Sequence, residues 1–75
     1  MFRYVVTIHE DGVAASVEQI TSTGSVLPKI TYPSIEELPD DVCEKVKRLK
    51  WVSETDQTFY EGVGTRVGQN IFWIC

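Results

Sequence analysis

The fold is decided by residues 2–20, FRYVVTIHEDGVAASVEQI. In the first part of this stretch aromatic and β-branched residues alternate along the chain, so that Phe2, Tyr4, Val6 and Ile8 share one face. A period of two with these residue types is typical of a β-strand whose one face is buried. The stretch therefore predicts a strand at the start of the chain.

A turn and a second strand follow directly. Asp11-Gly12 is a pair favoured in tight hairpin turns, because both central residues tolerate positive φ. The alternation resumes after Gly12 and slips by one residue at Ile20, which predicts either a bulge just before Ile20 or the end of the strand there. We expect a β-hairpin with strands at 2–9 and 13–20.

The middle of the chain predicts an edge strand and one helix. Pro28 cannot donate to a sheet ladder, so residues 26–32 are expected to form an edge strand or an extended linker. Ser34 and Glu37 have the spacing of a capping box, which predicts a short turn at 34–38. A helix over 39–50 then begins at Pro39, where the missing N–H is not needed.

The expected helix is amphipathic. Val42, Val46 and Leu49 form one apolar stripe, with Cys43 beside it. Asp40 and Asp41 at the start and Lys47, Arg48 and Lys50 at the end complement the helix dipole. We therefore expect this helix to pack its stripe against the sheet.

The last third of the chain predicts a final strand. Residues 71–75, IFWIC, are apolar on both faces, which indicates a central strand or a strand covered by a partner. Residues 58–60 are expected to begin a further strand, and residues 62–68 to form a glycine-punctuated bend. We thus predict one α+β domain over residues 1–75, of order β-β-(β)-α-β. Its small antiparallel sheet, the hairpin plus the last strand, packs against one helix.

Size and charge limit the function. A chain of 75 residues supports a core worth only about 3–5 kcal/mol of net stability, so a multi-step catalytic scaffold is not expected. Eleven acidic against seven basic residues give a net charge of −4, which disfavours polyanion binding and suits a partner with a basic surface. No apolar run approaches the ~20 residues of a membrane helix, and the N-terminus lacks the features of a secretion signal. With two cysteines, Cys43 and Cys75, both expected to be reduced, we predict a cytoplasmic protein.

The residues that carry chemistry do not form a recognisable catalytic or metal site. The glycines at 62, 64 and 68 do not have the G-x-G-x-x-G spacing, and no helix follows them, so a glycine-rich turn is expected. His9 is the only histidine and could pair with Cys43 or Cys75, yet Cys43 beside the apolar stripe is more typical of a small buried residue. We expect no cofactor, no metal and no enzymatic activity.

A basic segment offers an alternative function. It comprises Lys45, Lys47, Arg48 and Lys50 with Trp51. Together with Arg66 in the glycine turn, these residues would make a weak nucleic-acid-binding surface with a stacking platform. The helix dipole and side-chain pairs already explain these charges, however, and Arg66 is expected to be solvated or to hold an anionic group or an acidic loop.

The aromatic residues favour binding to a protein. Eight of 75 residues are Phe, Tyr or Trp, about twice what so small a core needs, and aromatic residues are enriched at interface centres. The leading hypothesis is a non-enzymatic protein-interaction module, also expected to form a homo-oligomer, that binds through an acidic and aromatic surface. The acidic parts would lie at 36–44 and 54–61. The candidate partner-binding residues are Trp51, Arg66, Phe72, Trp73, Asp40 and Asp41.

Three phrases of the sequence carry a resemblance. They are SIEELPDDV at 34–42, EGVGTR at 61–66 and IFWI at 71–74. Together they resemble small uncharacterised accessory proteins of tailed bacteriophages, which have a hairpin, an S-I-x-E-L-P-x-x-V phrase, a helix, a G-V-G-x-R turn and an aromatic last strand. The resemblance implies an accessory role in the cytoplasm of an infected cell, with a host or viral protein as partner. It transfers no catalytic residue. Its matching positions, Pro39, Gly64 and Arg66, are all explained by structural roles at a helix start and in a turn.

Overall fold

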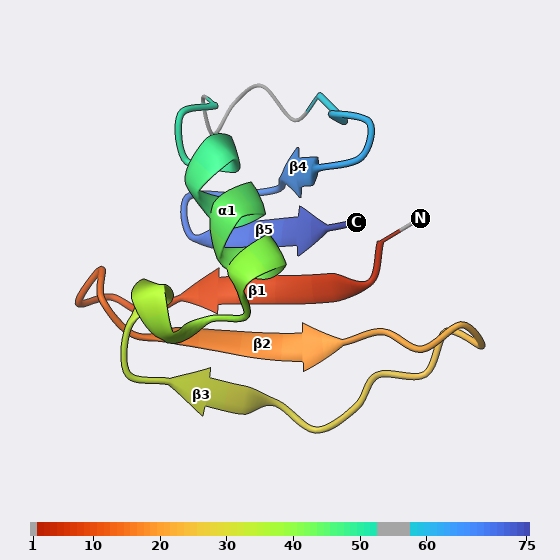
Figure 1. Cartoon of the computed structure of the whole chain (residues 1–75), viewed down its shortest axis with the longest axis horizontal. Coiled ribbons are helices and arrows are strands. Elements are labelled where there is room, and N and C mark those ends of the chain that lie inside the picture. The colour runs from red at the N-terminus through yellow and green to blue at the C-terminus, as the bar shows by residue number, and fades with distance from the viewer. Residues whose placement is uncertain (1, 53–57) are drawn as a thin grey trace.

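The computed structural model describes residues 2–52 and 58–75. A five-stranded antiparallel sheet of order β3-β2-β1-β5-β4 forms its base, and helix α1 lies across one face of that sheet (Figure 1). The elements in chain order are β1 (Tyr4–Ile8), β2 (Ala15–Gln19), β3 (Ile30–Tyr32), the 3₁₀ helix η1 (Ile35–Glu37), α1 (Asp40–Leu49), β4 (Gly64–Arg66) and β5 (Ile71–Ile74). The predicted α+β class is confirmed.

The N-terminal hairpin is confirmed, but its turn differs from the prediction. Strands β1 and β2 pair from Tyr4 opposite Gln19 to Ile8 opposite Ala15. Gly12 has φ of 73°, whereas Asp11 does not adopt positive φ, so the turn is not the two-residue type. The Asp11 carboxylate instead accepts hydrogen bonds from the backbone N–H groups of Val13 and Ala14, at 2.8 and 3.0 Å. This side-chain acceptor supports the longer loop, as aspartates commonly do in turns.

The third strand lies at the edge of the sheet, as Pro28 predicts. Strand β2 ends at Gln19, and Ile20 makes an isolated bridge with Val26. The chain returns past Pro28 and pairs with β2 over Ile30–Tyr32. The edge position leaves Ile30 exposed.

The helix is confirmed, whereas the capping box is not formed. Ser34 makes no side-chain cap hydrogen bond, and η1 is closed by backbone bonds such as that from the Leu38 N–H to the Ile35 carbonyl. The chain enters α1 through Pro39, whose carbonyl accepts a bond from the Cys43 N–H. The apolar stripe is buried together with Cys43, so α1 packs on the sheet as its sequence predicts. No helix in the described ranges is long and apolar enough to cross a membrane.

The C-terminal part contains a strand that the sequence does not predict. The prediction that a strand begins at residues 58–60 is wrong, because Tyr60 makes only an isolated bridge with Gly64 there. Strand β4 lies instead within the expected glycine bend and pairs with β5 from Gly64 opposite Ile74 to Arg66 opposite Phe72. Strand β5 is consequently central, with β1 on its other side.

The core lies between α1 and the sheet. Its largest fully buried side chains come from β5, β1 and α1. The buried hydrophobic residues are Val6, Ile8, Ala15, Val17, Leu38, Val42, Cys43, Val46, Leu49, Val63, Phe72 and Ile74. Because the strand residues among them alternate with others, every second strand position faces away from the helix.

Candidate functional site: the open face of the sheet

The face of the sheet opposite α1 carries the candidate site, and we call it the open face. In Figure 1 it is the side turned away from the viewer, behind the helix. The cross-strand register assigns its residues, because Val5 pairs with both Glu18 and Trp73, while Thr7 pairs with Ser16 and Ile71. The strand residues of the open face are Val5, Thr7, Ser16, Glu18, Thr31, Thr65, Ile71 and Trp73.

An aromatic cluster lies on the open face, formed by Phe2, Phe59 and Trp73. The ring centroids of Phe2 and Trp73 are 5.3 Å apart and those of Phe2 and Phe59 are 5.7 Å apart, both edge to face. Phe2 was expected to share the face of Val6, and this is wrong, because it lies before the first ladder pair and turns toward Trp73. Trp73 remains 38 % exposed, Phe59 49 % and the neighbouring Ile71 39 %. The cluster is therefore ordered by its own contacts and still offers apolar area to solvent.

Hydroxyl groups occupy the β2–β3 side of the open face. The His9 Nε2 lies 2.6 Å from the Ser16 Oγ, which in turn lies 3.3 Å from the Thr31 Oγ1. His9 therefore pairs with a serine on the open face, whereas Cys43 is buried beneath α1 on the opposite face of the sheet. The pairing of His9 with Cys43 that the sequence left open is therefore not formed, and Cys43 is the small buried residue that its place beside the apolar stripe predicts. Ser16 is only 4 % exposed, so this serine–histidine contact is not arranged for attack on a substrate.

The predicted partner-binding residues do not form one surface. Trp73 lies on the open face, whereas its neighbour Phe72 is 1 % exposed and belongs to the core. Trp51 follows the end of α1 and is 91 % exposed. Asp40 and Asp41 are exposed in the first turn of α1, on the other side of the sheet. Of these residues, Trp73 alone contributes to the aromatic cluster.

Arg66 is a structural residue in this fold. Its Nη1 donates to the carbonyl oxygens of Lys50 and Val52, at 3.2 and 2.7 Å. Its Nε and Nη2 donate to the carbonyls of Gly68 and Gln69, and the guanidinium lies 5.6 Å from the centre of the Phe72 ring. The expectation of a solvated side chain is wrong, because Arg66 joins the end of α1 to the turn before β5.

Two of the basic residues on the helix also have partners within the fold. The Lys45 Nζ donates to the carbonyl of Cys75 at 3.1 Å. The Lys47 Nζ lies 2.8 Å from the Glu36 carboxylate, and this hydrogen bond raises the pKa of Lys47. Arg66 is also bonded within the fold. The cations of the basic segment that remain for binding a polyanion are therefore mainly those of Arg48 and Lys50.

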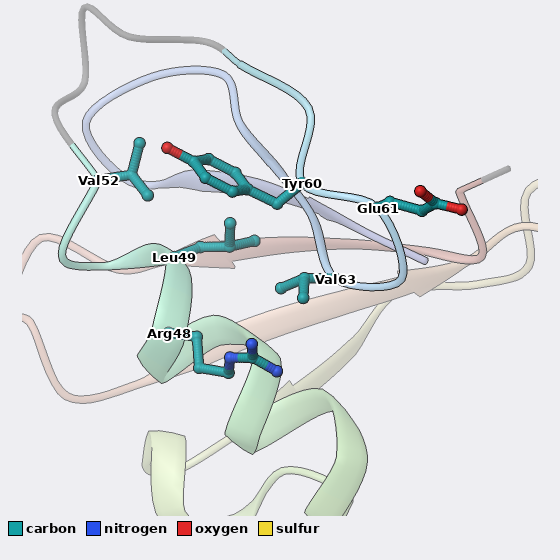
Figure 2. A pocket seen from close by; sticks show the side chains of 6 residues that line it. All are labelled: Arg48, Leu49, Val52, Tyr60, Glu61 and Val63. Carbon is teal, nitrogen blue, oxygen red and sulfur yellow. The ribbon is translucent and has the colours of Figure 1, made fainter.

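A concavity near the end of α1 lies between this helix and the turn before β4. It has a volume of about 330 Å³. Leu49 and Val63 form its apolar base below Tyr60, and Arg48 and Glu61 extend beside it (Figure 2). One guanidinium, one phenol and one carboxylate are its polar groups, and they do not supply a nucleophile with an adjacent base. The glycine turn thus lines an ordinary surface hollow.

An apolar groove of about 440 Å³ lies beside strand β3 on the helix side of the sheet. Tyr4, Tyr32 and Ile30 contribute to its lining, together with Leu27 and Pro28. The sequence did not predict this groove, because it depends on how far α1 extends over the sheet.

Phe2, Phe59 and Ile71 belong to the open face but were not among the predicted partner-binding residues. A signal for Ile71 is present in the alternation of IFWI, which places residues 71 and 73 on one side and 72 and 74 on the other. No such signal exists for Phe2 or Phe59, which lie outside the strands. The free thiols of Cys43 and Cys75 are not joined in a disulfide.

Searches against protein-family models, curated protein sequences and solved structures found no match to this chain. The residues of the open face are therefore interpreted from their own chemistry. Among residues 2–52 and 58–75, no three His, Cys, Asp or Glu side chains are grouped as a metal ion would require.

Proposed function

We propose that this protein is a non-enzymatic protein-interaction module whose binding surface is the aromatic cluster on the open face. The observation that carries the proposal is the placement of the aromatic residues. Of the eight in the chain, Phe72 alone is buried, and three of the others gather on the side of the sheet opposite α1. Large exposed aromatic side chains that lie together are typical of protein interfaces.

The geometry of the cluster suits a binding hot spot. Trp73 lies on a central strand, so its backbone is fixed by ladders on both sides. Phe2 and Phe59 restrict the rings further, and a side chain that is already ordered loses little entropy on binding. Tryptophan at the centre of such a patch commonly contributes 2 kcal/mol or more to an interface, by the usual hot-spot threshold.

The acidic residues would form a separate surface. Glu36, Glu37, Asp40, Asp41 and Glu44 all belong to η1 and α1, on the side of the sheet away from Trp73. A basic partner on these residues would leave the aromatic cluster free. Of the second predicted acidic part, 54–61, residues 54–57 lie outside the described residues. The proposal therefore rests on the aromatic cluster, and the acidic surface is not part of it.

The weak nucleic-acid-binding alternative has less support. Lys45, Lys47 and Arg66 are held by carbonyl or carboxylate groups of the chain itself, and five acidic residues share η1 and α1 with the basic segment. Binding to a polyanion derives its affinity from freely available cations. The alternative is retained as an outcome of the experiment below.

The biological setting is part of the proposal. The resemblance of residues 34–42, 61–66 and 71–74 to phage accessory proteins suggests a partner in the cytoplasm of an infected bacterium, of either host or viral origin. The free thiols of Cys43 and Cys75 are compatible with a reducing compartment.

Affinity capture from bacterial lysate tests the proposal. Tagged wild-type protein, Trp73→Thr and Trp51→Ala are compared with and without nuclease, and retained proteins are identified by mass spectrometry. Where the partner is a different protein of the lysate, a discrete protein that survives nuclease is expected, and it should be lost with Trp73→Thr and kept with Trp51→Ala. The Trp51 variant is the matched control because it removes an equally large exposed indole away from the open face.

Two results would contradict the proposal. Retention of nucleic acid alone, with a steep loss in salt, would favour the basic segment. Equal retention by Trp73→Thr and wild type would place binding away from the aromatic cluster. Circular dichroism of each variant establishes that a loss of binding is not a loss of fold.

A further inference from the structure

The open face has the dimensions of a protein–protein interface. The molecule measures 29 × 27 × 19 Å, and the sheet lies across its two longer axes. The rectangle that encloses the molecule in this plane, loops included, is therefore about 780 Å², an upper bound for the open face that is close to the roughly 800 Å² per partner that a standard interface buries. A partner would have to use most of the open face, including both the aromatic and the hydroxyl-bearing regions.

The charges of the chain are distributed so that two copies can approach through this face. Among its strand positions, Glu18 is the one charged side chain. The acidic residues of η1 and α1 lie on the opposite side of the sheet. A protein of net charge −4 would repel its own copy through those residues, and this repulsion is weakest when the two helices point outward.

The chemistry of the open face is self-complementary. Apolar groups of Ile71 and Trp73 can pack on the same groups of a copy. Thr31 is exposed and Thr7 is half-buried, and their hydroxyls each donate and accept hydrogen bonds, so like groups can meet without an unpaired donor or acceptor. A face dominated by charges of one sign could not pair with itself in this way.

We infer from these observations that the occupant of the open face is a second copy of this chain, packed sheet against sheet in a symmetric dimer. The two sheets would lie about 10 Å apart with side chains interdigitating, as in β-sandwiches. A two-fold axis close to Trp73 would bring the two aromatic clusters together, since symmetric interfaces use the same patch on both subunits. This inference rests on the proposed function, because it names the partner of the same surface.

Sedimentation and light scattering of the untagged chain test the inference. We expect a mass of twice 8.5 kDa, with dissociation at about micromolar concentration or below, as interfaces of this size show. Ile71→Lys places two like charges in the interface and Trp73→Thr removes its largest side chain. Each is expected to weaken dimerisation at least about thirtyfold, the equivalent of a hot-spot loss. Trp51→Ala should leave the dissociation constant unchanged.

A second measurement leaves the open face intact. The chain has two tryptophans, so Trp51→Phe makes Trp73 the only indole. Dimerisation should bury this indole, and its emission should shift to shorter wavelength over the concentration range in which the mass doubles. The Trp51→Phe variant shows whether dimerisation buries Trp73 even if the Trp73→Thr variant does not fold.

The outcomes separate this inference from the proposed function. A monomeric wild-type chain whose Trp73 still governs capture of a lysate protein would overturn the dimer and leave the interaction module. A monomeric chain that also captures no lysate protein through Trp73 would overturn both the dimer and the interaction module. A dimer that Ile71→Lys and Trp73→Thr leave unchanged, with constant Trp73 emission, would place the contact elsewhere and also overturn the inference.

Discussion

Replacing Gly64 by alanine should remove most of the stability of this domain. Gly64 begins β4 with φ of 136°, a backbone conformation that L-residues rarely adopt. A Cβ at this position would overlap the carbonyl oxygen of Trp73 on the paired strand β5. The overlap is with backbone, so no side-chain rotation can relieve it.

The expected loss is 3 kcal/mol or more, from two effects that the structure separates. The φ value alone costs about 1–3 kcal/mol for a residue other than glycine. To clear the Trp73 carbonyl, β4 must also move from β5, which weakens the β4–β5 ladder and the adjoining hydrogen bond from the Cys75 N–H to the Val63 carbonyl at about 1 kcal/mol for each bond. Since a domain of this size has about 3–5 kcal/mol in total, Gly64→Ala should be largely unfolded.

Urea unfolding followed by far-ultraviolet circular dichroism measures this effect. All variants are compared at one protein concentration, because self-association adds to the apparent stability. Gly12→Ala is the first control, since Gly12 also has positive φ but nothing lies near its missing side chain, and it should lose about 1–2 kcal/mol. Gly68→Ala, with neither strain nor contact, should be within about 0.5 kcal/mol of wild type. A Gly64→Ala protein as stable as Gly12→Ala would refute the close approach of β4 to β5.

Three further predictions concern other parts of the fold. Arg66→Ala removes four hydrogen bonds to carbonyls at a partly exposed site and should lower the free energy of unfolding in urea by about 2–4 kcal/mol. Arg66→Lys should restore less than half of this loss, because one ammonium group cannot bond both the end of α1 and the turn before β5. Hydrogen bonds from two backbone N–H groups lower the pKa of Asp11 from its ordinary value of 3.8. The ionised carboxylate therefore stabilises the fold at a pH above this ordinary value, and the stabilisation is lost as the pH falls through the lowered pKa of the folded protein. Asp11→Asn should therefore flatten the acid limb of the stability profile. Deletion of residues 71–75 removes the central strand and should abolish the native circular dichroism, so a folded deletion variant would show that β5 is dispensable.

Local patterns in the sequence predicted the elements that are stabilised by short-range interactions. The alternation around Val6 and Val17 predicts the hairpin, because the period of two places one face in the core. Pro28 predicts an edge strand, and the spacing of Val42, Val46 and Leu49 predicts the buried side of α1. In each case the deciding interaction lies within a few residues along the chain or depends only on which side is apolar.

Part of the candidate site followed from the same patterns. Trp73, one of the predicted partner-binding residues, lies on the open face and belongs to the aromatic cluster. The assignment of Phe72 to the same surface ignored the alternation of IFWI, which sends it into the core. Arg66 could not be assigned, since its carbonyl partners come from the end of α1 and from the turn before β5.

By itself the sequence determined the α+β class, the hairpin, the helix and the abundance of aromatic side chains beyond the needs of the core. Tertiary structure alone decided that Gly64–Arg66 is a strand. These three residues show no alternation, and they form a strand only because they pair with the edge of β5 that β1 does not occupy. It also decided that Phe2 packs on both Phe59 and Trp73 on the side of the sheet opposite α1. The physical reason is the same in both cases: these contacts join segments far apart in the chain, and short-range patterns carry no information about which segments become neighbours.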